Sequence, residues 1–571
     1  MENSESNESH GKIIIYQTLP RLFGNSNSSN RRNGTIWQNG CGKMNDFTPD
    51  ALRSIKELGA THVWYTGIIR HATKTNYEKY GIEASHPAVV KGEAGSPYAI
   101  NDYYDVDPDL AGQAPERMNE FQELITRTHS AGLRVLIDFV PNHVARQYRS
   151  VQKPQNVSDL GAGDDSSQAF SPLNNFYYLP GEVLEGQFDM QDGANQPYHE
   201  FPAKATGNDC FNAHPTSNDW YETVKLNYGV DYLGGKQTYF SPIPVTWKKM
   251  LDILSFWAGK GIDGFRCDMA EMVPVEFWNW VIPKLKKNYP GLLFIAEVYN
   301  PSEYRNYLQA GKFDYLYDKV GLYDTLRNII CERESATAIS HCWQSLEGIE
   351  KQMLNFLENH DEQRLASDFF AGEGHKGIPG MIVAACMNTN PVMVYFGQEL
   401  GERGMDTEGF SGLDGRTTIF DYWSIESIRN WQNGGKFNLE KLTESQKQLR
   451  SFYKRILTIS RNEIAISQGL FFDLTYVNRG GWSFNEHRQF AFMRKHGNEL
   501  LLIVVNFSPV PAHVGINIPA HAFDYLQLAP RIEYDVLELL SRKIEKVSLL
   551  PYKPTETDLD GHSGKILKFE L

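Results

Sequence analysis

The chain has 571 residues, of which 41% are hydrophobic and 22% charged, the balance of a folded protein with a large core. Its formal net charge of −14 argues against a nucleic acid or an anionic membrane as partner, because no excess of basic side chains can neutralise phosphates. The six cysteines show no C-x-x-C spacing, so we expect free thiols rather than disulfides or a zinc site.

The first segment, residues 1–11, is polar and rich in Ser, Asn and Glu, which predicts a disordered tail. It has no apolar signal core, and no 18-residue apolar run follows it. We therefore expect a cytoplasmic protein without a membrane anchor. A secreted protein that has lost its export signal would show the same pattern.

An amphipathic helix, a glycine and a short apolar strand recur over residues 12–145 and 248–465. Thr48 suits the cap of one such helix and Pro49 its first position, and Gly59 ends it. This alternation predicts parallel strands joined by right-handed crossovers. No G-x-G-x-x-G follows the first strand and the units approach eight, so we predict a (β/α)8 TIM barrel. The predicted strands are Ile13–Gln17, His62–Thr66, Arg134–Val140, Ile262–Asp268, Leu292–Val298, Gln352–Leu357 and Pro391–Phe396.

Residues 146–247 interrupt this pattern. They are rich in Asn, Gly, Pro, Asp and Tyr and contain no helix–strand pair, and a loop of this length is usually functional. We predict a domain inserted after the third barrel strand. Its aromatic side chains could stack on the rings of a ligand or pack the domain together, and the sequence leaves both open for Trp220, Tyr221, Tyr228 and Tyr232.

The hydrophobic period changes to two beyond about residue 466. Phe490–Arg494 and Leu500–Phe507 flank a turn at His496, Gly497 and Asn498, which predicts a hairpin. We therefore predict a C-terminal all-β sandwich domain over residues 466–571. We expect this domain to be a structural cap on the barrel, with ligand binding as the alternative.

Polar and charged side chains stand at the carboxyl ends of four predicted strands, where barrel enzymes place their reacting groups. A single aspartate there is more often a helix cap or a loop hydrogen-bonder. Many like charges at one barrel mouth destabilise the fold, however, so a protein retains them there when its function requires them. The residues concerned are Asp138, Asn142, His143, Arg266, Asp268, Glu297, Asn359, His360 and Asp361.

Cleavage of a glycosidic bond requires this combination, because one carboxylic acid must protonate the leaving oxygen and an ionised carboxylate must face the sugar carbon. Arg266 and Asp268 are two residues apart on a strand and point to the same side, so the arginine should hold Asp268 ionised. Glu297 follows an apolar strand, where partial burial would suit a proton donor. These arguments do not distinguish Asp268 from Asp361 as the nucleophile.

The four strand ends resemble the signature regions of the α-amylase family (glycoside hydrolase family 13), and Ile15–Gln17 and Tyr395–Glu399 are similar to its first and last barrel strands. The resemblance implies that Asp268 is the nucleophile, Glu297 the general acid/base and Asp361 the transition-state stabiliser. It also implies a set of substrate-binding residues, namely Tyr98, Asp102, His143, Arg266, His360 and Arg364.

The activity that the resemblance implies is hydrolysis of α-1,4-glucosidic bonds in starch- or glycogen-type glucans or maltooligosaccharides. Configuration is retained through a covalent glucosyl-aspartate intermediate. A transglycosylase or an oligosaccharide α-glucosidase on the same site is the alternative. A non-catalytic binding protein is disfavoured, because all three carboxylates are present. The expected partner is an α-glucan, no cofactor is required, and the oligomeric state stays open.

Two positions depart from the family pattern. Glu271 and Met272 replace the Lys-His pair that often follows the nucleophile, which leaves sugar preference beyond the cleaved bond open. Asn142 is the candidate ligand of the family's structural calcium, but Lys225 stands where a second ligand, an aspartate, is usual. An ammonium group cannot ligate calcium. We therefore predict that Lys225 pairs with acceptors near Asn142 in place of the ion.

Overall fold

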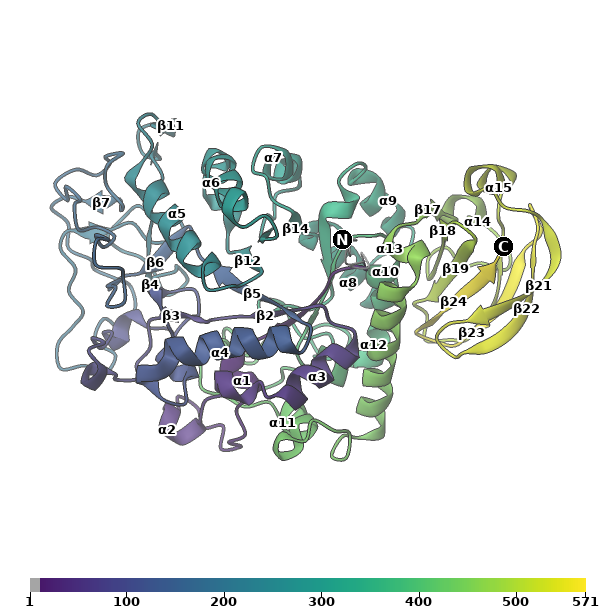
Figure 1. Cartoon of the computed structure of the whole chain (residues 1–571), viewed down its shortest axis with the longest axis horizontal. Coiled ribbons are helices and arrows are strands. Elements are labelled where there is room, and N and C mark those ends of the chain that lie inside the picture. The colour runs from purple at the N-terminus through teal and green to yellow at the C-terminus, as the bar shows by residue number, and fades with distance from the viewer. Residues whose placement is uncertain (1–10) are drawn as a thin grey trace, which may run out of the picture.

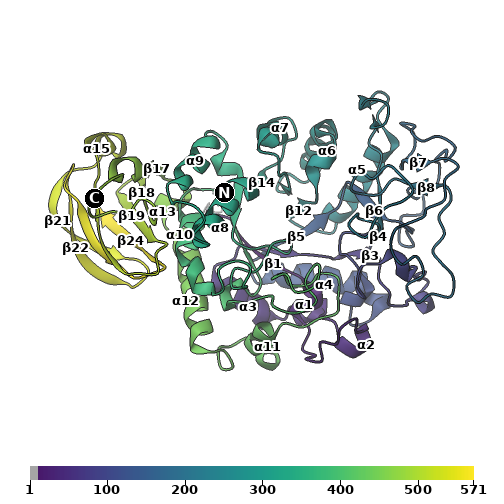
Figure 2. The ribbon, with the colours of Figure 1, turned by 180° about the vertical axis from the view of Figure 1, so that it is seen from behind.

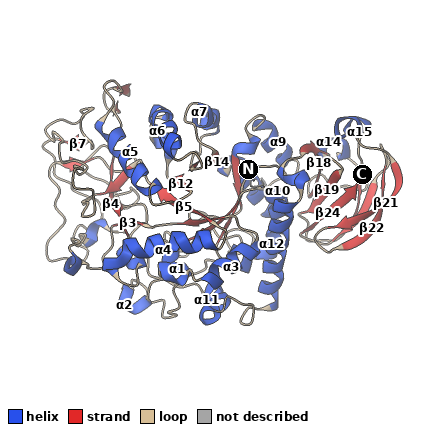
Figure 3. Cartoon of the chain, viewed as in Figure 1, coloured by secondary structure: helices blue, strands red, loops and turns tan. Residues whose placement is uncertain are grey.

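The computed structural model describes residues 11–571, so the predicted tail over 1–11 lies outside the described residues except for Gly11. Eight parallel strands form a closed barrel (Figures 1 and 3). The strand β1 (Ile14–Thr18) closes the barrel by pairing in parallel with both the second and the last strand. The other strands are β2 (His62–Tyr65), β5 (Arg134–Phe139), β12 (Gly264–Cys267), β13 (Leu293–Ala296), β14 (Tyr315–Tyr317), β15 (Met353–Phe356) and β16 (Val392–Tyr395). The predicted barrel is confirmed.

Seven of these strands coincide with the predicted ones, and β14 was not predicted. Its three residues, Tyr-Leu-Tyr, are too few to show a hydrophobic period. The helix α3 (Pro49–Leu58) begins as expected, because Thr48 Oγ1 accepts the backbone N–H of Ala51. The main outer helices are α4 (Arg117–Ser130), α5 (Val245–Ala258), α6 (Val275–Asn288), α7 (Tyr304–Gln309), α8 (Asp324–Ile330), α9 (Ala338–Ser345), α10 (Ile378–Cys386) and α12 (Glu444–Asn462).

The segment between β5 and α5 forms the predicted insertion, at one end of the long axis of the molecule (Figures 1 and 2). Its regular structure is limited to short antiparallel pairs: β6 (His143–Ala145) with β9 (Thr223–Lys225), β7 (Tyr178–Leu179) with β8 (Ala203–Lys204), and β10 (Val230–Asp231) with β11 (Gln237–Thr238). The first pair ties the insertion to the barrel directly after β5, beside the strand ends.

The C-terminal domain lies at the opposite end (Figures 1 and 2). Its six-stranded sheet has the order β17-β18-β19-β24-β21-β22, with β20 and β23 as a second, two-stranded sheet. The strands are β17 (Leu470–Asp473), β18 (Gln489–His496), β19 (Glu499–Asn506), β20 (Ala512–Ile516), β21 (Arg531–Glu538), β22 (Lys543–Leu549), β23 (Thr555–Leu559) and β24 (Ser563–Glu570). The domain also carries two helices that were not predicted, α14 (Thr475–Asn478) and α15 (Ala520–Leu526).

The strand β19 explains how this domain is attached. Leu501, Ile503 and Val505 belong to the hydrophobic core of the barrel, whereas the alternate residues of the strand belong to the core of the β domain. Because successive side chains of a strand point to opposite faces, β19 is buried on both sides. The domain therefore shares apolar packing with the barrel, which fits the expected structural cap.

Two other sequence expectations concern thiols and membranes. All six cysteines are free; Cys267, Cys342 and Cys386 are buried and the other three are partly exposed. Within residues 11–571, none of the helices has the length and apolarity needed to cross a bilayer.

Candidate active site

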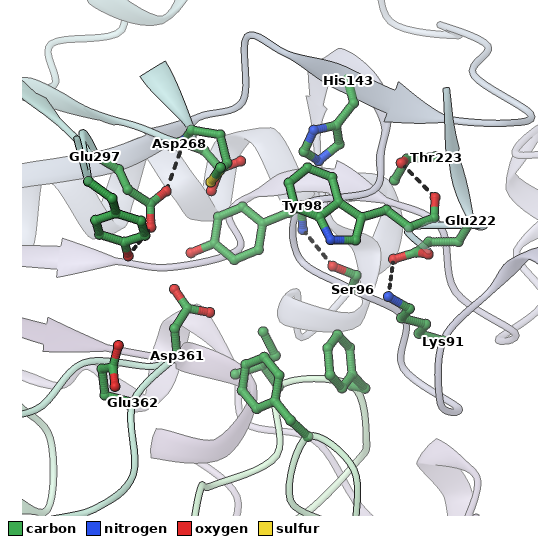
Figure 4. Close-up of a pocket in the computed structure, with 16 residues that line it drawn as sticks. Lys91, Ser96, Tyr98, His143, Glu222, Thr223, Asp268, Glu297, Asp361 and Glu362 are labelled. Atoms are coloured by element: carbon green, nitrogen blue, oxygen red, sulfur yellow. Dashed lines mark hydrogen bonds and ion pairs between the residues drawn. The ribbon is translucent and has the colours of Figure 1, made fainter. Parts of the chain in front are cut away.

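Strand ends of the barrel bring acidic side chains together at one pocket (Figure 4). Asp268 directly follows β12, Glu297 directly follows β13, and Asp361 lies in the loop after β15. All three line a cavity of about 320 Å³. Asp138, inside β5, lies beneath them and accepts a hydrogen bond of 3.0 Å from Trp64 Nε1. The predicted convergence of acids from separate strands is thus observed.

The buried guanidinium of Arg266 joins these acids. Its Nη1 donates to Asp268 Oδ1 at 2.7 Å, and its Nη2 forms an ion pair with Glu297 Oε2 at 2.8 Å. Nη1 also lies 3.6 Å from Asp138 Oδ1. One arginine therefore faces three carboxylates, and it holds Asp268 and Glu297 on either side of a single planar group.

The third acid is positioned by histidine and tyrosine. His360 Nε2 lies 3.0 Å from Asp361 Oδ2 and contacts the hydroxyl of Tyr98, and the rings of His360 and Tyr98 stack at 5.2 Å. The opposite ring nitrogen, Nδ1, lies 2.7 Å from Gln17 Nε2 on β1. His360 is buried, so it orients Asp361 and Tyr98 from below, whereas Tyr98 itself lines the cavity.

The carboxylates perturb one another. Burial raises the pKa of Asp268 well above its usual range, Glu297 and Asp361 add to that rise, and Arg266 opposes it. Arg266 thus favours the ionised form of Asp268 as expected, but burial outweighs it, so the expectation that Arg266 keeps this carboxyl readily ionised is not met. Burial also opposes ionisation of Asp361, but His360 and Arg266 outweigh it and lower its pKa.

A titration in such a site belongs to the group of acids rather than to one of them. Asp268 contacts the same guanidinium as Glu297, and its raised pKa means that it gives up its proton less readily than an isolated aspartate. Acid-assisted displacement at a sugar carbon requires two carboxyls close together, one as acid and one as nucleophile, and Arg266 brings Asp268 and Glu297 together in this way.

The insertion and a long loop after β16 supply the walls of the pocket. His143 and Trp220 line it from the insertion side, with ring centroids 5.2 Å apart. Among the four aromatics left open above, Trp220 alone lines this cavity. Tyr221 packs on Phe188, and Tyr228 and Tyr232 pack on other rings of the insertion and barrel.

Several lining residues were not predicted. Tyr299 donates to Glu297 Oε1 at 2.5 Å, and its position two residues beyond Glu297 was the available signal, since such residues share a side of an extended chain. The others carry no local motif: Lys91 and Glu222, which form an ion pair at 3.2 Å, and Phe410, Ile419 and Phe420 from the loop after β16. Only the folded chain brings them to the strand ends.

The assignment of Asp102 to substrate binding is wrong. Asp102 is fully buried away from the cavity, in β4 (Ile100–Val106). It pairs with Arg70 at 3.1 Å and accepts hydrogen bonds from the Ser150 hydroxyl at 2.6 Å and from two backbone N–H groups that follow it. Its function in this structure is to anchor the start of the insertion.

Arg364 is also placed away from the pocket. Its guanidinium is buried, pairs with Glu358 at 3.0 Å, donates to the carbonyl of Phe396 and lies 4.0 Å from the centroid of the Tyr395 ring. It links the loop after β15 to the end of β16. The predicted contact with sugar is therefore corrected to a structural role.

The candidate calcium position holds an ammonium group instead. Lys225 Nζ donates to Asn142 Oδ1 and pairs with Asp209 Oδ1, both at 2.6 Å. The pairing of Lys225 with Asn142 was predicted from the sequence. A buried cation that already occupies the Asn142 acceptor leaves no place for a second cation, so these residues do not fit a calcium ion. Within residues 11–571, no group of three or more His, Cys, Asp or Glu side chains is arranged to hold a metal.

Comparison with known proteins agrees with this geometry. The model of the α-amylase catalytic domain matches residues 17–463, most of the chain. This chain belongs to the α-amylase family. It is therefore an α-amylase family glycoside hydrolase, as its resemblance implied.

The relatives within the α-amylase family are distant. A cyclomaltodextrinase of a Bacillus species is 22% identical over 86% of this chain and 72% of its own length. Alpha-amylase 3 of Dictyoglomus thermophilum is 23% identical over 80% of this chain and 78% of its own. The solved structure of an α-amylase from Geobacillus thermoleovorans, complexed with acarbose, has the same fold, with a TM-score of 0.62 and 18% identity over 98% of this chain and 99% of that one.

Proposed function

We propose that this α-glucan hydrolase cleaves α-1,4-glucosidic bonds of maltooligosaccharides and starch-type glucans with retention of configuration. Asp268 is the nucleophile, Glu297 the general acid/base and Asp361 the stabiliser of the transition state. The observation that carries the proposal is the single Arg266 guanidinium between Asp268 and Glu297, with Asp361 in the same cavity. Such closeness suits direct attack rather than attack by a water held between distant carboxyls.

The proposed reaction follows from the groups present. Glu297 acts as the acid: its proton passes to the glycosidic oxygen as the bond between that oxygen and the sugar carbon breaks. Asp268, ionised and oriented by Arg266, bonds to the sugar carbon. Glu297 then takes a proton from water, which displaces Asp268. Asp361, whose pKa is low because of His360 and Arg266 despite burial, stays negative beside the oxocarbenium-like centre.

The competing activities, transglycosylation and α-glucosidase action on short sugars, use the same carboxylates. They differ in whether water or a sugar hydroxyl takes the second step and in how deep the pocket is. The walls built by Trp220, Phe410 and Phe420 supply apolar surface for a sugar ring, and this surface alone does not distinguish the activities. We place hydrolysis first because the relatives compared above carry the names of an amylase and a cyclomaltodextrinase.

An NMR time course on maltoheptaose, maltose and sucrose tests the proposal. We expect shortened maltooligosaccharides from maltoheptaose, appearing first as the α-anomer. The β-anomer as first product would overturn retention and with it the role of Asp268. Longer products from maltose would show that transfer outweighs hydrolysis.

We further infer that Lys225 replaces the structural calcium of the family. Its ammonium joins Asn142, next to the barrel strand β5, to Asp209 of the insertion, and so it would hold the insertion against the barrel without a metal. The cytoplasmic location stays a prediction.

A further inference from the structure

A second groove lies where the C-terminal domain meets the barrel. It has a volume of about 490 Å³ and is lined by residues of α9, β17, α14 and α15 and by Arg479. Figure 1 shows these elements next to one another, on the side of the barrel that faces the β domain, and Figure 2 shows α9, β17 and α15 there from behind. None of its lining residues lines the carboxylate cavity, so this junction groove is a separate site.

Aromatic rings form one wall of the junction groove. Tyr476 and Tyr525 are 49% and 53% exposed, although both contact the ring of Phe472, at centroid distances of 6.4 and 6.0 Å. His521 lies against the same rings, and its Nε2 is 2.6 Å from the Tyr476 hydroxyl. The exposed rings are therefore held in place by their neighbours while their outer surfaces face water.

Polar groups also line the junction groove. Asp473 accepts hydrogen bonds from the Ser340 hydroxyl at 2.5 Å and from Trp343 Nε1 at 2.8 Å, which fixes its carboxylate between the two domains. Gln344 and Arg479 line the groove with exposed side chains, and no hydrogen bond of either side chain occurs among residues 11–571. Donors and acceptors are thus available next to an apolar face.

A hexose ring has one apolar C–H face and a rim of hydroxyl groups. A site that binds it therefore combines an aromatic surface with hydrogen-bond donors and acceptors, as the junction groove does. An aromatic ring covers the C–H face, while carboxylate, amide and guanidinium groups bind the hydroxyls. A nucleic acid does not suit a groove that contains the Asp473 carboxylate in a chain of net charge −14.

We propose that the junction groove binds a segment of an α-glucan chain, stacked on Tyr476 and Tyr525, outside the reacting site. The identity of the sugar rests on the proposed function, because the cleaved polymer is the glucan that this chain meets. Binding a distant segment of the same polymer raises the local concentration of the remaining bonds near the carboxylates. Short substrates, which cannot reach both sites, gain nothing from the groove.

The test uses the full chain with Glu297→Gln, so that the sugar is not consumed, and measures binding of maltoheptaose by calorimetry and by NMR. We expect two sites. Adding Tyr476→Ala and Tyr525→Ala removes one of them, with affinity there falling about tenfold or more. Both tyrosines are exposed, so the fold should tolerate the change. Tyr80→Ala, an exposed tyrosine that lines neither site, is the matched control and keeps both.

Kinetics of the active enzyme provide the second measurement. The double alanine variant should show a higher KM on soluble starch, with kcat and the kinetics on maltotriose unchanged. Tyr476→Phe, which keeps the ring, should behave as the unaltered enzyme. An unchanged KM on starch together with a single maltoheptaose site before substitution overturns the proposal, as does a groove that is covered by a second copy in solution.

These outcomes separate the two proposals. If the protein hydrolyses maltooligosaccharides but has a single maltoheptaose site, the junction-groove proposal is overturned and the proposed function stands. If the protein has two maltoheptaose sites but the unaltered chain has no hydrolytic activity, the proposed function is overturned and glucan binding in the groove stands.

Discussion

Two clusters of buried acids in this molecule differ in their charge balance. At the strand ends, one arginine, Arg266, faces Asp138, Asp268 and Glu297. Along β4, Asp102 and Asp105 face two arginines, Arg70 and Arg117, at 2.7 to 3.3 Å. The β4 cluster is neutralised and holds the chain together, whereas the strand-end cluster is left with excess negative charge.

The comparison teaches that acidity alone did not identify the site. Buried charges that are fully paired serve structure, and breaking a pair is destabilising. Buried charges without enough partners oppose folding and persist where chemistry uses them. Asp102 was assigned to substrate binding on the resemblance to the α-amylase family. In the structure Asp102 pairs instead with Arg70, 32 residues earlier in the chain, which shows its structural role.

The largest expected effect concerns the strand-end cluster, which carries the excess negative charge. Asp268→Asn should lower kcat by about 10⁴-fold or more, because the nucleophile is lost. The melting temperature should stay the same or rise, since a like charge is removed from a buried site. Turnover assays and thermal melts check both, with Asp252→Asn on α5 as the control. A destabilised Asp268→Asn protein would show that this cluster is structural after all.

A substitution in the β4 cluster should have the opposite result: it should lower stability and leave activity unchanged. Arg117→Met removes two hydrogen bonds to Asp105, of 2.7 and 2.9 Å, and leaves that carboxylate buried. The free energy of unfolding should fall by about 3–5 kcal/mol. Activity per folded molecule should persist. Denaturant titration measures the loss, and Arg53→Met, at an exposed pair with Asp50, should change little. If the Arg117→Met protein lost activity without losing stability, the β4 cluster would not have the structural role assigned to it.

Buried histidines predict an acid-sensitive fold. Burial lowers the pKa of His62 to about 4 and those of His71 and His143 to about 3. Between these values and the unfolded pKa of 6.5, the unfolded chain binds more protons than the folded one, so stability is present above pH 6.5 and is lost as the pH falls. Each histidine contributes up to about 1.4 kcal/mol per pH unit. Melting temperatures that are flat from pH 7 to 5 would contradict this.

The smallest expected effect concerns calcium. Because Lys225 already occupies the Asn142 acceptor, EDTA should leave the melting temperature and the activity unchanged. Thermal melts with EDTA and with added calcium check this. Lys225→Asp supplies the missing carboxylate ligand and is the informative variant, since its melting temperature should rise with calcium. A stoichiometric calcium bound by the unaltered protein would refute the replacement.

Local sequence patterns were enough for most of the barrel, because helices capped as at Thr48 show an amphipathic period and strands such as β5 and β13 are largely apolar runs of four or more residues. The strand β14, with three residues, fell below that limit, and the helices α14 and α15 interrupted the predicted β domain without a distinct signal.

The sequence by itself determined the barrel, its insertion and the residues Asp268, Glu297 and Asp361, because motifs at strand ends are local and parallel strands in a barrel direct their carboxyl ends to one edge. Only the tertiary structure decided which charges are paired. That pairing depends on side chains far apart in the chain: Arg364 belongs to Glu358 and Tyr395, Trp220 reaches the pocket, and the junction groove exists only where two domains meet. Partners brought together by packing leave no periodic trace in sequence.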